Sequence, residues 1–341
     1  MIVRIFLRLL VTLVVVLATA WGSLALWYQL PMTTACKYAF IALWCMLAVG
    51  LLLALWRRRP WLALGGFLLL FALLQVWWNT LAPSNKRVWA DDLAQLTTGR
   101  VVDSQVTLNN VRNFDWRSDE DYTPRWETRR YDLDRLASVD LATSYWGMPA
   151  IAHVLVSFGF DDGQHVVFTV EIRKERGESY SEIGGFFKQF ELSIVAADER
   201  DALRVRTNVR NEDVYLYRVN LSDEAIRALF LSYIEQANQL EEEPRFYNTI
   251  TANCTTIVFD MMRQIVQGLP MDHRLLLTGY LPAYVRDVGG FQANLGLEEL
   301  QARGRITERA QQANDGPEFS RLIRRGVPGW GGTVGDTASA Q

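Results

Sequence analysis

The sequence predicts an α+β protein in which three N-terminal transmembrane helices precede one globular domain, built from an antiparallel sheet and a cysteine-bearing helix. Two observations support this class. Residues 1–83 carry few charges and long apolar runs, whereas the remainder has the composition of an ordinary globular domain. Beyond residue 150, segments with alternating apolar residues are followed by segments with helical apolar spacing. We therefore divide the chain into 1–83, 84–150, 151–305 and 306–341.

The N-terminal part contains three runs long enough to cross a bilayer, which requires about 20 apolar residues as a helix. They extend from Ile5 to about Tyr28, from about Cys36 to Trp56, and from Trp61 to about Trp78. Tryptophans favour the membrane interface, and five stand near the ends of these runs: Trp27, Trp56, Trp61, Trp77 and Trp78. A cleaved signal peptide with a site at 18–20 is the alternative for the first run, but that run continues beyond the length of such segments.

Basic residues predict the orientation of the three helices. Arg4 and Arg8 precede the first run and Arg57–Arg59 separate the second from the third, whereas only Lys37 lies near the intervening loop. Positively charged loops remain in the cytoplasm. We expect a multi-pass protein of a bacterial inner membrane with a cytoplasmic N-terminus and everything after about Pro83 in the periplasm.

Composition excludes several classes of function. The net charge is −3, and the chain has no Lys/Arg-rich tract with interleaved aromatics, so we expect no nucleic-acid partner. Cys254 is the only cysteine outside the apolar part, which excludes a disulfide framework there. The three histidines show no metal-ligand spacing, so we expect no metal and no cofactor. No feature of the sequence sets the oligomeric state.

Two regions of the globular part carry weak patterns. Residues 84–150 contain short strand-like pieces at 101–102 and 106–108, with a polar aromatic stretch from Asn113 to Trp126. We interpret this region as an irregular pre-domain or lid. Residues 306–341 are mostly rich in Gly, Gln and Arg, and we expect a mobile C-terminal tail there.

The strongest strand pattern predicts a hairpin with a defined register. Residues 151–160 and 164–173 are expected to be its strands, and both place apolar residues at even positions. Both sets can share one face only if the paired residue numbers add up to an even number. A three-residue loop at 161–163 with Gly163 in the left-handed conformation achieves this. Position 160 then pairs with 164, and His153 lies opposite Glu171.

Further elements are expected downstream of the hairpin. Alternation predicts strands at Phe190–Ala196, Leu203–Thr207 and Asp213–Val219. Ser222 is a good N-cap for a helix that extends to about Glu242. A second helix is predicted from near Asn253 to about Gln267.

Cys254 is the best candidate for a nucleophile. With Asn253 as the N-cap it occupies the first position of a helix, where the thiol pKa is lowered. The backbone N–H groups of that helix start, which include Thr255, can hold an oxyanion. We add Tyr247, Asn248 and Asn253 itself as further candidate contacts for the oxyanion or substrate. The alternative is a buried and inert cysteine at the start of a helix.

A cysteine nucleophile requires a base and a group that orients this base. His153 is the best of the three histidines, because the hairpin register places Glu171 opposite it and a carboxylate fixes the imidazole tautomer. Ser157 or a backbone carbonyl could orient it instead. His165 lies near the hairpin turn and His273 in a loop-like stretch. The alternative is that His153 is a core histidine bonded to a carboxylate.

Two other features invite a functional interpretation. Arg173 can contact a phosphate or carboxylate, although a surface salt bridge is its ordinary role. The segment Gly184-Gly185-Phe186-Phe187 is either a strand start or core turn, or a loop that meets lipid or an acyl chain. An acyl pocket would be lined by Phe186, Phe187 and Phe190.

The order of the two candidate catalytic residues resembles a known arrangement. A histidine on a strand that precedes a cysteine at a helix start is similar to the circularly permuted branch of the papain-like NlpC fold. The region of about 88–290 more closely resembles the bacterial Lnb-type periplasmic-domain family. The resemblance rests on Asn110–Phe114, Ser144–Gly147, Ala152-His153, Ser157–Phe160, Val170–Arg173, Glu191-Leu192, Ala197–Asp201, Leu203–Asn208, Val214–Tyr217, Tyr247-Asn248 and Asn253–Thr256. Ala252 departs from the family pattern, which has a second asparagine there.

This resemblance implies a papain-like catalytic domain over 151–305 with a Cys-His dyad or triad. In lipoprotein N-acyltransferases of the Lnb type, an acyl chain passes through a thioester to the α-amine of a lipoprotein. We therefore expect a thiol acyltransferase or lipid acyl hydrolase with a membrane lipid or lipoprotein as substrate. A peptidoglycan peptidase or amidase of the NlpC type, and a non-catalytic envelope scaffold, are the alternatives.

Overall fold

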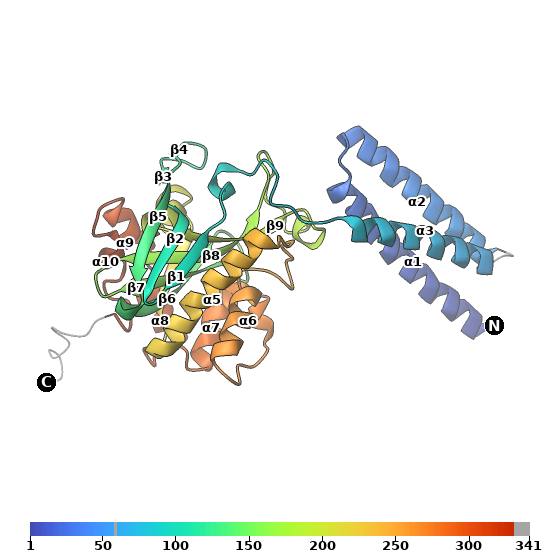
Figure 1. Ribbon diagram of the computed structural model, residues 1–341. Coiled ribbons are helices and arrows are strands. Elements are labelled where there is room, and N and C mark those ends of the chain that lie inside the picture. Colours follow the sequence, from blue (N-terminus) through green and yellow to red (C-terminus); the bar gives the residue numbers. More distant parts are fainter. Residues whose placement is uncertain (58–59, 331–341) are drawn as a thin grey trace. The chain divides into compact units, whose positions relative to one another are not determined.

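The computed structural model describes residues 1–57 and 60–330 and divides the chain into two compact units (Figure 1). The first unit consists of Met1–Ser84 together with Tyr180–Glu191. The second consists of Asn85–Ser179 and the chain from Leu192 onwards.

The predicted apolar runs form three long helices: α1 (Ile2–Gln29), α2 (Thr34–Trp56) and α3 (Pro60–Thr80). Each is long and apolar enough to cross a membrane. Gly22 allows their close packing, because a Cβ at this position would lie 2.8 Å from Leu74 and 2.9 Å from Trp44. The Trp44 indole Nε1 donates to the Thr19 carbonyl at 3.0 Å. Arg58 and Arg59, which contribute to the predicted orientation, lie outside the described residues.

The segment Tyr180–Glu191 packs against the ends of α1 and α3 within the first unit. Its 3₁₀ turn η3 (Gly184–Phe186) is followed by Phe187, whose ring stacks on Tyr28 with centroids 5.8 Å apart. Gln29 Nε2 donates to the Phe187 carbonyl at 2.7 Å, and Lys188 Nζ donates to the Trp78 carbonyl at 2.9 Å. The Gly184–Phe187 segment is therefore a turn that contacts the transmembrane helices.

The second unit is built on an eight-stranded mixed sheet. The strand order is β1-β2-β9-β8-β7-β6-β10, and β5 pairs with β2 beside this path. The pairing of β2 with β9 is parallel, and the pairings of β1–β2, β2–β5, β6–β7, β7–β8 and β6–β10 are antiparallel. The strands are β1 (Thr98–Val102), β2 (Gln105–Arg112), β5 (Trp126–Asp132), β6 (Leu136–Tyr145), β7 (His153–Phe160), β8 (His165–Arg173), β9 (Glu191–Ala197) and β10 (Asp213–Arg218). A separate ribbon joins β3 (Asp115–Trp116) and β4 (Tyr122–Thr123).

The predicted register of the β7–β8 hairpin is confirmed. Leu155 pairs with Thr169 and Gly159 with His165, so every pair has the expected sum of residue numbers. Phe160 N–H donates to the Gln164 carbonyl at 2.9 Å across the three-residue loop. Gly163 has a φ of +84°, the left-handed conformation that glycine adopts without steric cost.

Helices cover both faces of the sheet (Figure 1). Val154, Val156 and Phe158 face one core, which they share with α5, α6 and α7. Leu155 and Val167 face the opposite core, which contains residues of α4, α9 and α10. The helices are α4 (Glu199–Ala202), α5 (Asp223–Glu242), α6 (Thr256–Ile265), α7 (Leu281–Asp287), α8 (Leu297–Gly304), α9 (Thr307–Ala313) and α10 (Phe319–Ile323). Ser222 caps α5 as predicted, since its hydroxyl accepts from the Ala225 N–H.

The expectation of an irregular region at 84–150 is wrong for most of this segment, because β1, β2, β5 and β6 belong to the central sheet. Two of these strands, β5 and β6, carry charged residues that interrupt the apolar alternation expected of a strand. β5 reads Trp-Glu-Thr-Arg-Arg-Tyr-Asp and exposes charged residues from a strand outside the main path of the sheet. β6 carries Asp140, which is buried because Arg324 neutralises it.

Two further expectations fail. Residues 203–207 are not a strand: they lie after α4, at the start of a π-helical turn at Val205–Val209. Val205 packs there against Phe114 and Trp116, so tertiary packing overrides the alternating pattern. Residues 306–330 are not a mobile tail, because Ile306, Phe319 and Ile323 are fully buried in the second core. Residues 331–341 lie outside the described residues.

Candidate active site

Cys254 lies in a capped loop directly before α6. Asn253 Oδ1 accepts hydrogen bonds from the N–H groups of Thr255 (2.8 Å) and Thr256 (2.9 Å), and its carbonyl accepts from Ile257 N–H. These are the bonds of an N-cap, although the regular helix begins two residues later than predicted. Asn253 Nδ2 donates to the Thr249 carbonyl at 2.7 Å. The cap thus fixes the position of the buried thiol at the helix start.

His153, the first residue of β7, interacts with the Cys254 thiol, and this interaction raises the pKa of His153 and lowers that of Cys254. Its Nε2 lies 3.0 Å from Glu171 Oε1 and 2.6 Å from Thr169 Oγ1. Thr169 Oγ1 itself donates to Glu171 Oε1 at 3.1 Å. Because Nε2 carries the proton shared with these two oxygens, Nδ1 is the nitrogen that remains for the thiol. The predicted trio of Cys254, His153 and Glu171 is therefore assembled in space.

A second layer of charges surrounds Glu171. Arg206 Nη2 lies 3.5 Å from Glu171 Oε1, and Arg206 Nη1 donates to Glu212 Oε2 at 3.0 Å. Ser144 donates a short hydrogen bond to the same Glu212 oxygen. Arg206 and Glu212 are buried, so each depends on the other for its charge balance. This chain holds the Glu171 carboxylate in its ionised form beside the imidazole.

The electrostatics of the trio favour a thiolate–imidazolium pair. Burial disfavours the charged imidazole, but the negative charge of Glu171 and the hydrogen bonds with Cys254 and Glu171 outweigh it and raise the pKa of His153 to about 8. Burial also opposes ionisation of the thiol, yet the His153 hydrogen bond and charge and the Val154 N–H together lower the pKa of Cys254. Burial opposes ionisation of Glu171 as well, but His153 and Arg206 hold its pKa well below its usual range.

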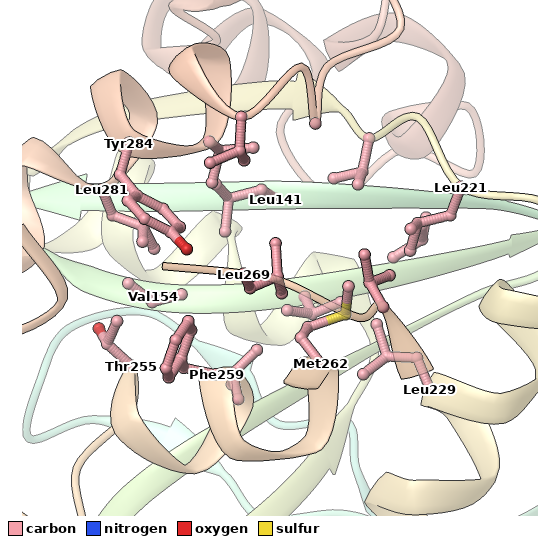
Figure 2. Close-up of a pocket in the computed structure, with 18 of the residues that line it drawn as sticks. Leu141, Val154, Leu221, Leu229, Thr255, Phe259, Met262, Leu269, Leu281 and Tyr284 are labelled. Carbon is pink, nitrogen blue, oxygen red and sulfur yellow. The ribbon is translucent and has the colours of Figure 1, made fainter. Parts of the chain in front are cut away.

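An apolar cavity of about 200 Å³ is lined by Val154 and Thr255, the sequence neighbours of His153 and Cys254, but by none of the trio itself. It runs between β6 and β7 on one side and α6 and α7 on the other, with Leu229 of α5 also contributing. Figure 2 shows Val154, Thr255 and Tyr284 at one end, and Leu221 and Leu229 at the other. Val154 follows His153 in sequence and Thr255 follows Cys254, so the first of these ends is the catalytic end. A fatty chain, and not a polar peptide, matches such a lining.

Thr255 provides the one polar side chain at the catalytic end whose oxygen has no partner among the described residues. Its side chain is buried, its Oγ1 makes no hydrogen bond, and the residue lines the cavity (Figure 2). Tyr284, by contrast, donates to the Pro270 carbonyl at 3.0 Å. A buried hydroxyl without a partner is unfavourable by about 1–3 kcal/mol, so a bound polar group would relieve this cost.

The structure revises the other predicted oxyanion and substrate contacts. The N–H groups of Thr255 and Thr256 are engaged by the Asn253 cap, which leaves the Cys254 N–H as the amide without a partner in the described chain. Asn248 Oδ1 accepts from the Ile250 and Thr251 N–H groups and so shapes the turn before Cys254. Tyr247 is half-buried and packs against the core that also contains Cys254.

Two other candidates make their hydrogen bonds outside the trio. Arg173 is buried: it donates to the carbonyls of Leu93 and Ala94 and to Asn85 Oδ1, and it stacks on Trp89, so it secures the chain segment that precedes β1. It is neither a substrate contact nor a surface salt bridge. Ser157 donates to Glu199 Oε1 at 2.5 Å and does not orient His153.

The remaining two histidines do not contact Cys254. His165 Nδ1 lies 3.1 Å from the Gly163 carbonyl in the hairpin turn. His273 is exposed and pairs with Asp272 at 3.2 Å. The aromatic trio expected to line an acyl pocket is also displaced: Phe187 packs on the transmembrane helices, and the cavity is lined by neither Phe186, Phe187 nor Phe190.

Sequence reasoning missed Thr169, Arg206 and Glu212. The hairpin register contained enough information to find Thr169, which pairs with Leu155 and therefore lies diagonally next to His153. Arg206 was hidden because its segment was interpreted as a strand. Within the described residues, no group of three or more His, Cys, Asp or Glu side chains could hold a metal ion.

Comparison with known proteins gives one match. Residues 122–281 match the model of the Lnb N-terminal periplasmic domain, a range that contains His153, Glu171 and Cys254. No curated protein and no solved structure matches the chain. Together with the three long apolar helices, the match indicates a membrane protein with a periplasmic domain. Residues 122–281 therefore belong to the Lnb N-terminal periplasmic domain family.

Proposed function

We propose that this protein is a thiol acyltransferase that moves a fatty acyl chain from a membrane lipid or lipoprotein through a thioester on Cys254. The observation that carries the proposal is that Cys254, His153 and Glu171 interact and that their sequence neighbours Val154 and Thr255 line one end of an apolar cavity. A histidine on a strand that precedes a cysteine at the start of a helix is consistent with a permuted papain-like, NlpC-type fold. The orientation that we propose has a cytoplasmic N-terminus in a bacterial inner membrane and the site in the periplasm.

In the first step the Cys254 thiolate attacks the carbonyl carbon of an ester. The Cys254 N–H and the Thr255 hydroxyl donate to the resulting oxyanion. When the intermediate collapses, the C–O bond breaks and the leaving alkoxide takes a proton from the His153 imidazolium. The products are an S-acyl enzyme and a lipid alcohol. Glu171 keeps the imidazolium oriented through Nε2.

In the second step an amine attacks the thioester carbon. Neutral His153 accepts the proton from the attacking nitrogen, and the C–S bond breaks to release an amide and the thiolate. The proton on His153 restores the thiolate–imidazolium pair, so the cycle needs no further reactant. Water in place of the amine gives a free fatty acid, which is the hydrolase variant of the same chemistry.

The character of the cavity favours an acyl group over a peptide. Apart from Thr255, Tyr284 and Asn220, all side chains that line it are hydrocarbon or thioether groups, and the lining contains no charged side chain. A peptide would leave its backbone N–H and C=O groups without partners there, at a cost of a few kcal/mol each. A fatty chain has no hydrogen-bonding groups that would require partners in the cavity. The NlpC-type peptidase is therefore the weaker alternative.

The experiment uses full-length wild type, Cys254→Ala and His153→Ala in membranes, with His273→Ala as the matched histidine control. Each is incubated with a diacylated lipopeptide or with muropeptides, and the products are followed by mass spectrometry. The proposal requires N-acylated or deacylated lipopeptide from wild type and His273→Ala alone. Cys254-dependent muropeptide cleavage without a lipid product would support the peptidase. Activity that persists in Cys254→Ala would refute a thioester mechanism, and an inert wild type would favour a scaffold.

A further inference from the structure

Six large apolar side chains are exposed on loops next to the catalytic residues. Each exposes between 38% and 61% of its surface, which is unusual for side chains of this kind in a cluster. We call this set the apolar rim, and it consists of Trp146, Met148, Ile250, Leu276, Leu277 and Tyr280.

Hydrogen bonds hold the loops of the apolar rim together. Gly279 N–H donates to the Ala150 carbonyl at 3.0 Å, and Tyr145 OH donates to the Gly279 carbonyl at 2.7 Å. Thr278 Oγ1 accepts from Ala152 N–H at 2.9 Å, one residue before His153. A Cβ on Gly279 would lie 2.0 Å from the Pro149 carbonyl oxygen, so only glycine permits this approach. The loops that carry Trp146 and Tyr280 are therefore adjacent.

Ile250 belongs to a third loop, the turn that leads to Cys254. This turn comprises residues 248–252, and the pKa of Cys254 is lowered by the neighbouring His153. Leu275 and Leu281 line the cavity and flank the exposed Leu276, Leu277 and Tyr280 in sequence. The same chain segment thus contributes both to the apolar rim and to the wall of the cavity.

Charges beside the apolar rim are balanced. Arg274 Nη2 pairs with Asp272 at 2.8 Å and Arg274 Nη1 pairs with Asp287 at 2.6 Å, while Arg286 contacts the other oxygen of Asp287. These acids therefore present no net negative charge that would repel anionic lipid headgroups. Three helices that can cross a membrane belong to the same chain, so the chain itself would tether this domain to a bilayer.

We propose that the apolar rim docks onto the surface of the lipid bilayer, so that an acyl chain enters the cavity directly from the membrane. Exposed Trp, Met and Leu side chains insert into the boundary between headgroups and acyl chains, as they do in interfacial proteins. Docking removes the need for a fatty chain to pass through water. The inference extends the proposed function, on which it rests for the identity of the substrate.

The first test separates docking from catalysis. Full-length wild type, Trp146→Ser/Met148→Ser and Leu276→Ser/Leu277→Ser are reconstituted into phosphatidylglycerol/phosphatidylethanolamine nanodiscs. Val101→Ser/Val102→Ser is the matched control, since both valines are exposed on β1. Acylation of Cys254 is measured with the bilayer phospholipid and with a water-soluble butyryl thioester. Docking predicts a loss of about tenfold or more with the phospholipid in the rim variants only, and less than about twofold with the soluble substrate. Equal rates with the phospholipid, or equal losses with both substrates, would overturn it.

The second test needs no activity, so it remains informative if the proposed function fails. In a Cys36→Ala/Cys45→Ala/Cys254→Ala chain, Met148→Cys or Val102→Cys is labelled with an environment-sensitive fluorophore in nanodiscs. Lipids with a quencher near the headgroup should quench the label at position 148 severalfold more than the label at position 102. Equal quenching at the two positions would refute docking, whether or not the protein transfers acyl groups.

Discussion

Nε2 of His153 lies 3.0 Å from Oε1 of Glu171, on the neighbouring strand of the β7–β8 hairpin. Their approach follows from the length of the hairpin loop, because a loop of three residues sets the pairing that brings these two positions together. Glu171 in turn lies 3.5 Å from Arg206, in the π-helical turn that follows α4. The sheet thus orients the base His153, and the neighbouring Glu171 carboxylate favours its protonated form.

Glu171→Gln should lower the activity and shift its pH dependence. The pKa of His153 is raised to about 8 from an ordinary value of 6.5, so the imidazolium that protonates the leaving group persists up to about pH 8. Acylation by wild type should therefore decline as the pH rises through about 8. Without the carboxylate, burial dominates and the pKa falls. The decline should then begin at a lower pH, and the maximum rate should drop by about tenfold or more.

The measurement is the pH profile of Cys254 acylation with a soluble ester of an alkyl alcohol, whose alkoxide leaving group requires the proton. Glu298→Gln, an exposed change at the start of α8, serves as the control. A Glu171→Gln profile that coincides with that of wild type would contradict the assigned orienting role. The raised pKa of His153 also makes the free energy of unfolding depend on pH. The stabilisation that protonated His153 contributes is complete below about pH 6.5 and is lost as the pH rises through about 8.

Thr255→Val should lower activity without destabilising the protein. Valine matches the shape of threonine and removes a buried hydroxyl that has no partner in the described chain, so stability should stay equal or rise by about 1 kcal/mol. The loss of an oxyanion donor should slow acylation by about a hundredfold. Thermal unfolding in detergent tests the predicted stability, and the acylation rate tests the predicted loss of activity. A normal rate in this variant would show that the Thr255 hydroxyl does not contact the reacting carbonyl.

Leu221→Trp should shorten the acyl chains that the site accepts. Leu221 lies at the end of the cavity remote from Thr255 (Figure 2), so an indole there fills the space required by the chain terminus. Transfer of a palmitoyl group should fall by about tenfold or more, while transfer of a butyryl group should remain as in wild type. Rates across a series of acyl thioesters measure this, with Val101→Trp as the surface control. An unchanged chain-length profile would place the acyl chain elsewhere.

Arg324→Met should destabilise the second unit strongly. The guanidinium is buried and pairs with Asp140 at 2.9 Å and with Glu199 at 2.7 Å. Its removal leaves two buried carboxylates without their partner, at a cost of about 3–5 kcal/mol. Thermal unfolding followed by circular dichroism should show a clear fall in Tm. Arg321→Met, which loses only an exposed pair with Glu318, should leave the Tm nearly unchanged. Equal Tm values in the two variants would contradict a structural role for the segment 306–330.

Elements that depend on local interactions could be predicted from the sequence. Apolar runs long enough for a bilayer predicted α1 to α3, alternation and loop length predicted the β7–β8 register, and Ser222 predicted the start of α5. In each of these cases the determining interaction lies within one element or between adjacent strands. The pairing of His153 with Glu171 follows from such an interaction, which is why it could be predicted without a structure.

The parts that failed depend on distant partners. β6 was not expected because Asp140 interrupts its apolar pattern, and the residue that neutralises Asp140 lies near the other end of the chain. Arg206 contacts Glu171 only because its segment folds into a π-helical turn instead of a strand. The acyl cavity was expected around Phe187, but this ring packs on Tyr28 of the membrane unit. Charge pairing and packing across the chain, which a local pattern does not encode, decided these three cases.

The most direct test of the central claim is the mass of the full-length protein after a short incubation with a palmitoyl-bearing phospholipid. We predict a gain that corresponds to one palmitoyl group, that is located on the peptide containing Cys254 and that is removed by neutral hydroxylamine. The gain should be absent in Cys254→Ala and reduced in His153→Ala. A palmitoyl group that forms equally on Cys254→Ala, or lipid products from wild type without any acylated enzyme even after rapid quenching, would contradict a thioester on Cys254.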